Sequence, residues 1–110
     1  MRSRKDQRIE LIDEVYYEVG RTETLARWTD ISRNGIFVQT MRPLPVGDQV
    51  KLRIRLGKPD KYYRAVGIVR HSLDFVGMGV EFTHLHPEAK GLIEEMVAVT
   101  SPGSKVSTNS

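Results

Sequence analysis

Two sets of polar residues in the first third of the chain have the types and spacing that ligand chemistry requires. Arg4 and Arg8 form an R-x-x-x-R spacing, and Asp30, Ser32 and Gly35 form a D-x-S-x-x-G spacing. A guanidinium binds a phosphate through two parallel hydrogen bonds, whereas a carboxylate accepts hydrogen bonds from N–H groups. A glycine has no Cβ and lets the backbone approach a ligand closely. Together, these residue types predict a site for a ligand that carries both phosphates and hydrogen-bond donors.

The two motifs differ in the strength of the evidence that each provides for a binding site. With 11 Arg among 110 residues, the R-x-x-x-R spacing is expected about once by composition. With 6 Asp, 7 Ser and 9 Gly, the D-x-S-x-x-G spacing is expected roughly 0.03 times, so it is the stronger signal. A simpler interpretation stays open: Asp30 and Ser32 can cap a turn through local hydrogen bonds, and Asn34-Gly35 is a hairpin signal by itself.

The elements that must position these residues are mostly strands. Apolar residues alternate with polar residues or glycine at 15–19, 50–56 and 76–82, and β-rich runs cover 24–29, 36–38 and 63–70. Turn signals separate these six runs, and their spacing predicts a six-stranded antiparallel β-barrel. After Pro87, apolar residues recur with helical spacing and predict a C-terminal α-helix that packs on the barrel. This face comprises Ala89, Leu92, Ile93, Met96 and Val97. The fold class is therefore all-β dominated, with one helix.

Length and composition bound the remaining possibilities. The 110 residues suffice for one core, which we expect over 9–99, between a mobile N-terminal arm at 1–8 and a flexible tail at 100–110. No apolar run approaches the ~20 residues needed to cross a bilayer, and the charged N-terminus does not resemble a signal peptide, so we expect a cytoplasmic protein without membrane insertion. The chain has no Cys, and its three histidines do not form a metal-binding set. We therefore expect no metal, no cofactor and no enzymatic activity.

The sequence resembles the PilZ domain, the bacterial receptor module for cyclic di-GMP, over roughly residues 4–98. Arg4 and Arg8 match the R-x-x-x-R of that family, and Asp30, Ser32 and Gly35 match its D-x-S-x-x-G. The family fold is a six-stranded antiparallel barrel with a helix near the C-terminus, as the strand and helix patterns also predict. Further phrases typical of the family are found at 35–38, 43–47 and 77–82.

The resemblance implies a role for each motif residue. The arginine pair would fold over the phosphates and guanines of the ligand, while Asp30 and Ser32 would meet it from the barrel surface. Gly35 would hold the turn open, and Arg33 and Asn34 are expected to be neighbours of the ligand because they lie inside the motif. In place of the V-x-W phrase that many family members carry, this chain has Val69-Arg70-His71. His71 is therefore a candidate to stack on a guanine, against the alternative of an ordinary surface histidine.

These observations predict a cyclic di-GMP receptor or adaptor whose arm becomes ordered on binding and presents a new surface to an unidentified downstream protein. Two alternatives stay open. One is a small barrel that binds a protein partner without nucleotide. The other is an RNA-binding barrel, although a nucleic-acid partner is not our expectation. An RNA-binding barrel would use the basic strand residues Lys51, Arg53 and Arg55 to bind phosphates, and Trp28, Tyr62 or Tyr63 to stack on bases.

Overall fold

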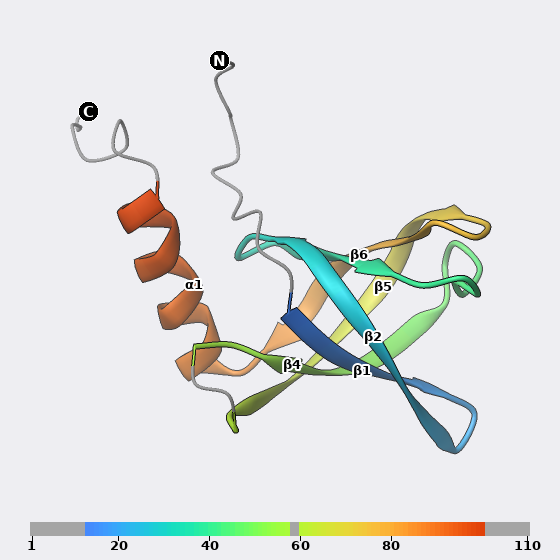
Figure 1. Cartoon of the computed structure of the whole chain (residues 1–110), viewed down its shortest axis with the longest axis horizontal. Helices are drawn as coiled ribbons and strands as arrows, with labels where there is room; N and C mark the ends of the chain where they lie inside the picture. The colour runs from blue at the N-terminus through green and yellow to red at the C-terminus, as the bar shows by residue number, and fades with distance from the viewer. Residues whose placement is uncertain (1–12, 58–59, 101–110) are drawn as a thin grey trace, which may run out of the picture.

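Strands dominate the structure, as the alternation of apolar residues predicts. A computed structural model of the protein describes residues 13–57 and 60–100, which form six strands and one helix (Figure 1). The elements are β1 (Asp13–Val19), β2 (Thr22–Ile31), β3 (Gly35–Gln39), β4 (Gln49–Arg55), β5 (Tyr62–Leu73), β6 (Gly77–Leu85) and α1 (Pro87–Thr100). Each of the six predicted strands and the predicted helix is therefore confirmed.

The strands close into an antiparallel barrel in the order β1-β2-β3-β6-β5-β4. The closing pair is β1 with β4, where Val15 pairs with Ile54 and Tyr17 pairs with Leu52. β3 is followed in the chain by β4 but pairs with β6, so the segment from Thr40 to Asp48 crosses one end of the barrel. Each of the six strands therefore has a paired neighbour on both sides, which confirms the predicted fold class.

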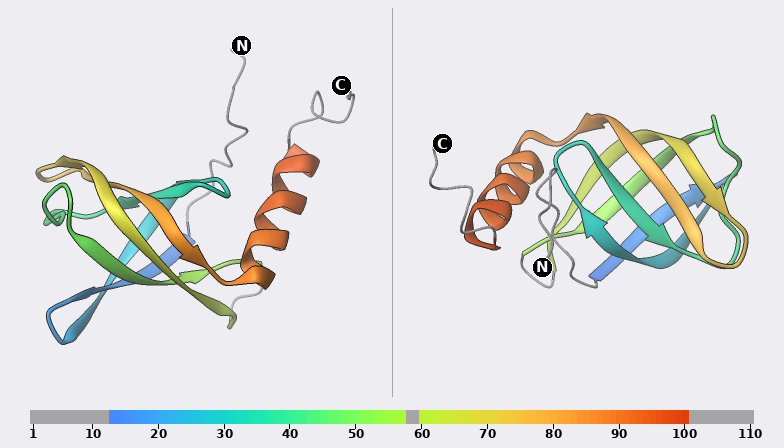
Figure 2. Two further views of the ribbon diagram at one scale, coloured as in Figure 1. Left: turned by 180° about the vertical axis from the view of Figure 1, so that it is seen from behind. Right: turned by 90° about the horizontal axis from the view of Figure 1, so that it is seen from above.

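The barrel interior is filled by the alternate, inward-facing residues of every strand. Trp28 and Tyr17 are the largest of the fully buried side chains, exposed by 1% and 2%. α1 closes one end of the barrel (Figure 2), where Ala89 and Ile93 are fully buried and Leu92 and Met96 pack against the core. Four residues of the predicted helical face therefore have the predicted role.

Three features differ from the predicted boundaries. β2 continues to Ile31, so Asp30 belongs to a strand and only Ser32 to Asn34 form the turn, because Asp30 and Ile31 still pair with β3. β5 continues to Leu73, so His71 lies within a strand that pairs with β6 rather than at its end. The helix ends at Thr100, the first residue of the predicted tail. Arg4, Arg8, the rest of the predicted arm and residues 101–110 lie outside the described residues.

Within the part of the chain that the structure describes, no helix combines the length and the hydropathy required to span a membrane.

Candidate functional site

The hairpin between β2 and β3 carries the D-x-S-x-x-G motif, and its turn is held by Ser32. The backbone N–H of Ser32 donates to the carbonyl of Gly35 (2.9 Å), and the N–H of Asn34 donates to the Ser32 hydroxyl (3.2 Å). The Ser32 residue is only 4% exposed. Its hydroxyl therefore performs the turn-capping role that the simpler interpretation of the motif assigns to it. Its contact with a ligand stays a prediction.

Gly35 is required by the packing of β3 against β6. A Cβ at this position would lie 2.5 Å from the carbonyl oxygen of Val80, which is too close for any side chain. On the same side of the hairpin, the N–H of Phe82 donates to the carbonyl of Asn34 (2.9 Å). Sequence reasoning assigned this glycine to close approach by a ligand, whereas the close approach in the structure is made by a neighbouring strand.

Asp30 and His71 lie in one row of residues that crosses four strands. Asp30 of β2 pairs with Phe37 of β3, Phe37 pairs with Gly79 of β6, and Gly79 pairs with His71 of β5. Neighbouring strands are ~4.8 Å apart, so the row is roughly 14 Å long. Asp30 is half-buried, and within residues 13–57 and 60–100 its carboxylate makes no hydrogen bond or ion pair.

A groove of about 260 Å³ lies on the outer surface of β3, β6 and β5, beside this row. It brings together three of the predicted site residues, namely Asn34, Gly35 and His71. The remaining lining residues are Ile36, Phe37, Arg70, Gly79, Val80 and Glu81.

Two glycines allow aromatic rings to lie close to the floor of this groove. A Cβ on Gly79 would lie 3.3 Å from Cδ2 of His71, and a Cβ on Gly77 would lie 2.7 Å from Cε2 of Phe37. The rings therefore occupy the space that larger residues on β6 would fill. An imidazole and a phenyl ring in this position offer surfaces on which a purine can stack.

Sequence reasoning missed Phe37, Arg70 and Glu81 as candidates. The alternation at 76–82 already placed Gly77, Gly79 and Glu81 on the side of β6 that faces away from the core. The missing information was that β6 is the neighbour of β3, which brings this face beside the D-x-S-x-x-G hairpin.

Arg33 is directed away from the groove, toward the helix. One of its guanidinium nitrogens lies 3.7 Å from a carboxylate oxygen of Glu94 in α1, and both side chains are well exposed. The structure therefore does not place Arg33 with the other predicted site residues. Arg4 and Arg8 cannot be placed, because they lie outside the described residues.

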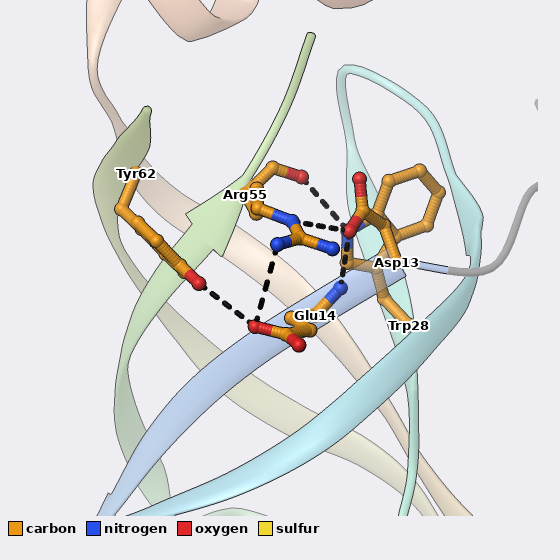
Figure 3. A network of polar contacts seen from close by, with 5 residues as sticks. All are labelled: Asp13, Glu14, Trp28, Arg55 and Tyr62. Atoms are coloured by element: carbon orange, nitrogen blue, oxygen red, sulfur yellow. Dashed lines mark hydrogen bonds and ion pairs between the residues drawn. The ribbon is translucent and has the colours of Figure 1, made fainter. Parts of the chain in front are cut away.

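A polar network fixes the first residues of β1, the strand that follows the segment containing Arg4 and Arg8 (Figure 3). Arg55 Nε–H donates to Asp13 Oδ1 (2.6 Å), the Tyr62 hydroxyl donates to Glu14 Oε1 (2.8 Å), and Trp28 Nε1–H donates to the Arg55 carbonyl (3.2 Å). The hydrogen bond to Asp13 raises the pKa of Arg55, and the hydrogen bond to Glu14 raises the pKa of Tyr62. The network therefore holds the first two residues of β1 in place.

The RNA-binding alternative assigns the phosphate contacts to basic residues of β4. Two of them, Arg53 and Arg55, are instead paired with acidic residues of neighbouring strands. Arg53 donates two hydrogen bonds of 2.8 Å to the carboxylate of Glu23 and lies over the ring of Tyr16, 4.6 Å from its centroid. The hydrogen bond from Arg53 lowers the pKa of Glu23. Trp28 and Tyr63, two of the rings considered for base stacking, are 1% and 6% exposed. This arrangement argues against the RNA-binding alternative.

Comparisons with known proteins agree with the observed fold. Residues 2–99 match the PilZ domain. The fold is similar to that of the Bacillus subtilis inhibitor of motility (MotI/DgrA), with a TM-score of 0.74 and 17% identity over 94% of this chain and 54% of that one. It is also similar to the Borreliella burgdorferi PlzA protein in complex with c-di-GMP, with a TM-score of 0.63 and 14% identity over 84% of this chain and 40% of that one. The chain thus spans about half the length of these two proteins or less. No curated protein matches it in sequence.

Proposed function

The chain belongs to the PilZ domain family, and from this premise we propose that it is a cyclic di-GMP receptor that binds its ligand on the outer face of β2, β3, β6 and β5. The observation that carries the proposal is the row from Asp30 to His71, which adjoins the groove that also contains Asn34 and Gly35. A ligand with two bases and two phosphates fits a row of this length better than a mononucleotide does. The PlzA structure, a complex with c-di-GMP, has a similar fold.

Asp30 and His71 would bind different parts of the ligand. The half-buried carboxylate of Asp30, which has no partner among the described residues, is suited to accept hydrogen bonds from N1–H and N2–H₂ of one guanine. The imidazole of His71 is suited to stack on the other guanine, because the residue is exposed and Gly79 lets its ring lie close to β6. Asn34, in the turn beside them, would contact the ligand from the rim of the groove.

Arg4 and Arg8 would supply the phosphate contacts. Both precede β1, whose first residues are held by the network of Asp13, Glu14 and Arg55. The arm would therefore be ordered by the ligand from a fixed starting point. Coupled ordering of a segment costs roughly 2–5 kcal/mol of the gross interaction energy, which is compatible with a micromolar affinity of about −8 kcal/mol.

The ordered arm and the bound nucleotide would together form a surface for a downstream protein, so the chain would act as an adaptor in the cytoplasm and not as an enzyme. Among the described residues, no group of three or more acids and histidines is placed to hold a metal ion.

Calorimetric titration with cyclic di-GMP tests this proposal. Cyclic di-AMP, which differs in its bases, and GMP, which is a single nucleotide, are the control ligands. Arg8→Ala and Asp30→Ala should each weaken binding by roughly 10- to 100-fold or more, because each removes charge-assisted hydrogen bonds worth about 1.5–3 kcal/mol. Their melting temperatures, measured by circular dichroism, should stay close to that of the parent.

Matched controls are Arg21→Ala and Asp74→Ala, which change exposed residues in the turns after β1 and β5. Both should bind cyclic di-GMP as the parent does. If Arg8→Ala binds as tightly as the parent, the site assignment is wrong. If the parent itself does not bind cyclic di-GMP, the proposed function is wrong.

A further inference from the structure

Glu81 and Arg70 form an ion pair on the side of the groove that adjoins the D-x-S-x-x-G hairpin. Glu81 of β6 pairs directly with Gly35 of β3. Arg70 Nε–H donates to Glu81 Oε1 (2.7 Å), and the two side chains are 55% and 54% exposed. Both residues line the groove that contains Asn34, Gly35 and His71. The pair is therefore part of the same surface as the proposed ligand site.

The carboxylate of Glu81 keeps most of its capacity to accept hydrogen bonds. A carboxylate has about four acceptor positions on its two oxygens. Arg70 uses one position on Oε1. Oε2 has no partner among residues 13–57 and 60–100. The hydrogen bond from Arg70 also restricts the rotation of the Glu81 side chain, so the carboxylate is held in a defined position before any ligand arrives.

The separation of Glu81 from Asp30 suits the two ends of one dinucleotide. The two residues are two strands apart, and along the strand direction they differ by two residues, since Asp30 pairs with Phe37 and Glu81 pairs with Gly35. With ~4.8 Å between strands and ~3.4 Å per residue, their Cα atoms are roughly 12 Å apart. Gly35 lies between the two strands on this side, where it adds no side chain. A ligand can therefore reach both carboxylates across this surface.

We propose that Glu81 reads the Watson–Crick edge of the second guanine of the ligand, and that Arg70 is a positioning residue that holds the Glu81 carboxylate. The inference rests on the proposed function and deepens it, because it assigns a base-selecting residue to the same site. Guanine presents N1–H and N2–H₂ side by side, and these two donors match the two oxygens of a carboxylate. Adenine presents an N6–H₂ donor beside the N1 lone pair, which would face a carboxylate oxygen with no proton between them. The site would therefore favour guanine partly by rejecting adenine.

The test uses a ligand in which one base is changed. Cyclic di-GMP, cyclic di-AMP and 3′,3′-cyclic GMP–AMP are titrated into the parent protein and into Glu81→Gln. The parent should prefer cyclic di-GMP over the mixed nucleotide by roughly 10-fold or more, the discrimination typical of one bidentate base contact. In the place of the carboxylate, a glutamine amide offers one donor and one acceptor, which match N1 and N6–H₂ of adenine but set the amide N–H₂ against one of the two guanine donors. Glu81→Gln should therefore lose about 10-fold in affinity for cyclic di-GMP and should no longer prefer it over the mixed nucleotide.

Two further comparisons separate base reading from a structural effect. Glu18→Gln makes the same change at an exposed residue of β1 and should leave both affinities unchanged. Arg70→Ala should reduce the preference for cyclic di-GMP over the mixed nucleotide, whereas Arg70→Lys, which retains a cation beside Glu81, should restore part of it.

The inference is overturned if Glu81→Gln keeps the affinity and the preference of the parent, or if it weakens all three ligands equally together with a lower melting temperature. Either result would leave the proposed function in place, because the parent would still bind cyclic di-GMP. Failure of the parent to bind cyclic di-GMP would instead remove the proposed function and this inference together.

Discussion

Two surfaces of the same barrel differ in whether their half-buried carboxylates have partners within the fold. The network face, formed by Asp13, Glu14, Arg55, Tyr62 and the indole N–H of Trp28, connects each of these groups to another part of the barrel (Figure 3). The groove face, formed by the row from Asp30 to His71 and the adjoining groove, contains a half-buried carboxylate without a partner among the described residues and glycines in place of larger side chains.

The difference indicates that the two faces contribute to different properties. A polar group that finds its partner within the fold stabilises that fold, whereas a group left without one gains its hydrogen bonds only when a ligand supplies them. Functional sites are where proteins depart from local rules that favour stability. We therefore expect substitutions on the network face to change the free energy of unfolding, and substitutions on the groove face to change binding.

The largest effect is expected from Trp28→Phe, on the network face. The indole is 1% exposed, and its N–H donates to the Arg55 carbonyl (3.2 Å). The substitution removes this hydrogen bond and leaves a cavity, so the free energy of unfolding should fall by about 2–4 kcal/mol. Denaturant unfolding followed by circular dichroism measures the change. The affinity of the folded protein for cyclic di-GMP should stay within about 2-fold of the parent, since the indole faces the core. A large loss of affinity would show that the two faces are not independent.

Gly35→Ala should change both stability and binding, because Gly35 packs against β6 and also lines the groove. Its effect on the free energy of unfolding should be smaller than that of Trp28→Phe. The new Cβ would meet the Val80 carbonyl oxygen at 2.5 Å, so β3 and β6 must move apart. Forcing extra volume into a packed position costs about 1–3 kcal/mol, and the same movement would distort the groove and weaken binding of cyclic di-GMP. Gly91→Ala is the matched control, because a Cβ there meets nothing within 4 Å and alanine favours a helix by about 1 kcal/mol. Equal stability of the two variants would contradict the proposed role of the Gly35–Val80 contact.

The sequence predicts the fold better than it predicts the contacts on either face. The strands, the barrel and the buried face of the helix follow from periodicity, because apolar side chains must alternate or recur to reach one core. The D-x-S-x-x-G residues follow from composition statistics and from the resemblance to PilZ domains. Glu81 and Arg70 were missed, because their place beside Gly35 depends on the pairing of β6 with β3 and of β5 with β6. Strands β3 and β6 are more than 35 residues apart in the chain.

The sequence also does not identify the ion-pair partners of the charged residues. Arg53 and Arg55 alternate with apolar residues in β4, and the pattern shows only that they face outward. Their acids, Glu23 and Asp13, lie on β2 and β1, about 30 to 40 residues away in the chain. Without these contacts, a strand of paired arginines cannot be told from a strand that is free to bind phosphates.

The smallest effect is expected from Glu23→Gln, which removes the ion pair of Glu23 and Arg53. This change tests whether an ion pair on the barrel surface contributes to stability. The hydrogen bond from Arg53 places the pKa of Glu23 below its ordinary value of 4.5. Because the folded state lowers this pKa, the pair stabilises the fold above about pH 4.5, and the contribution is lost as the pH falls through the lower, folded-state pKa. Thermal melts of the parent and Glu23→Gln should therefore differ slightly at pH 6 and converge toward about pH 3, and the difference should shrink in about 1 M salt because the pair is exposed. A difference that stays constant across this pH range would mean that the glutamate acts through packing and not through its charge.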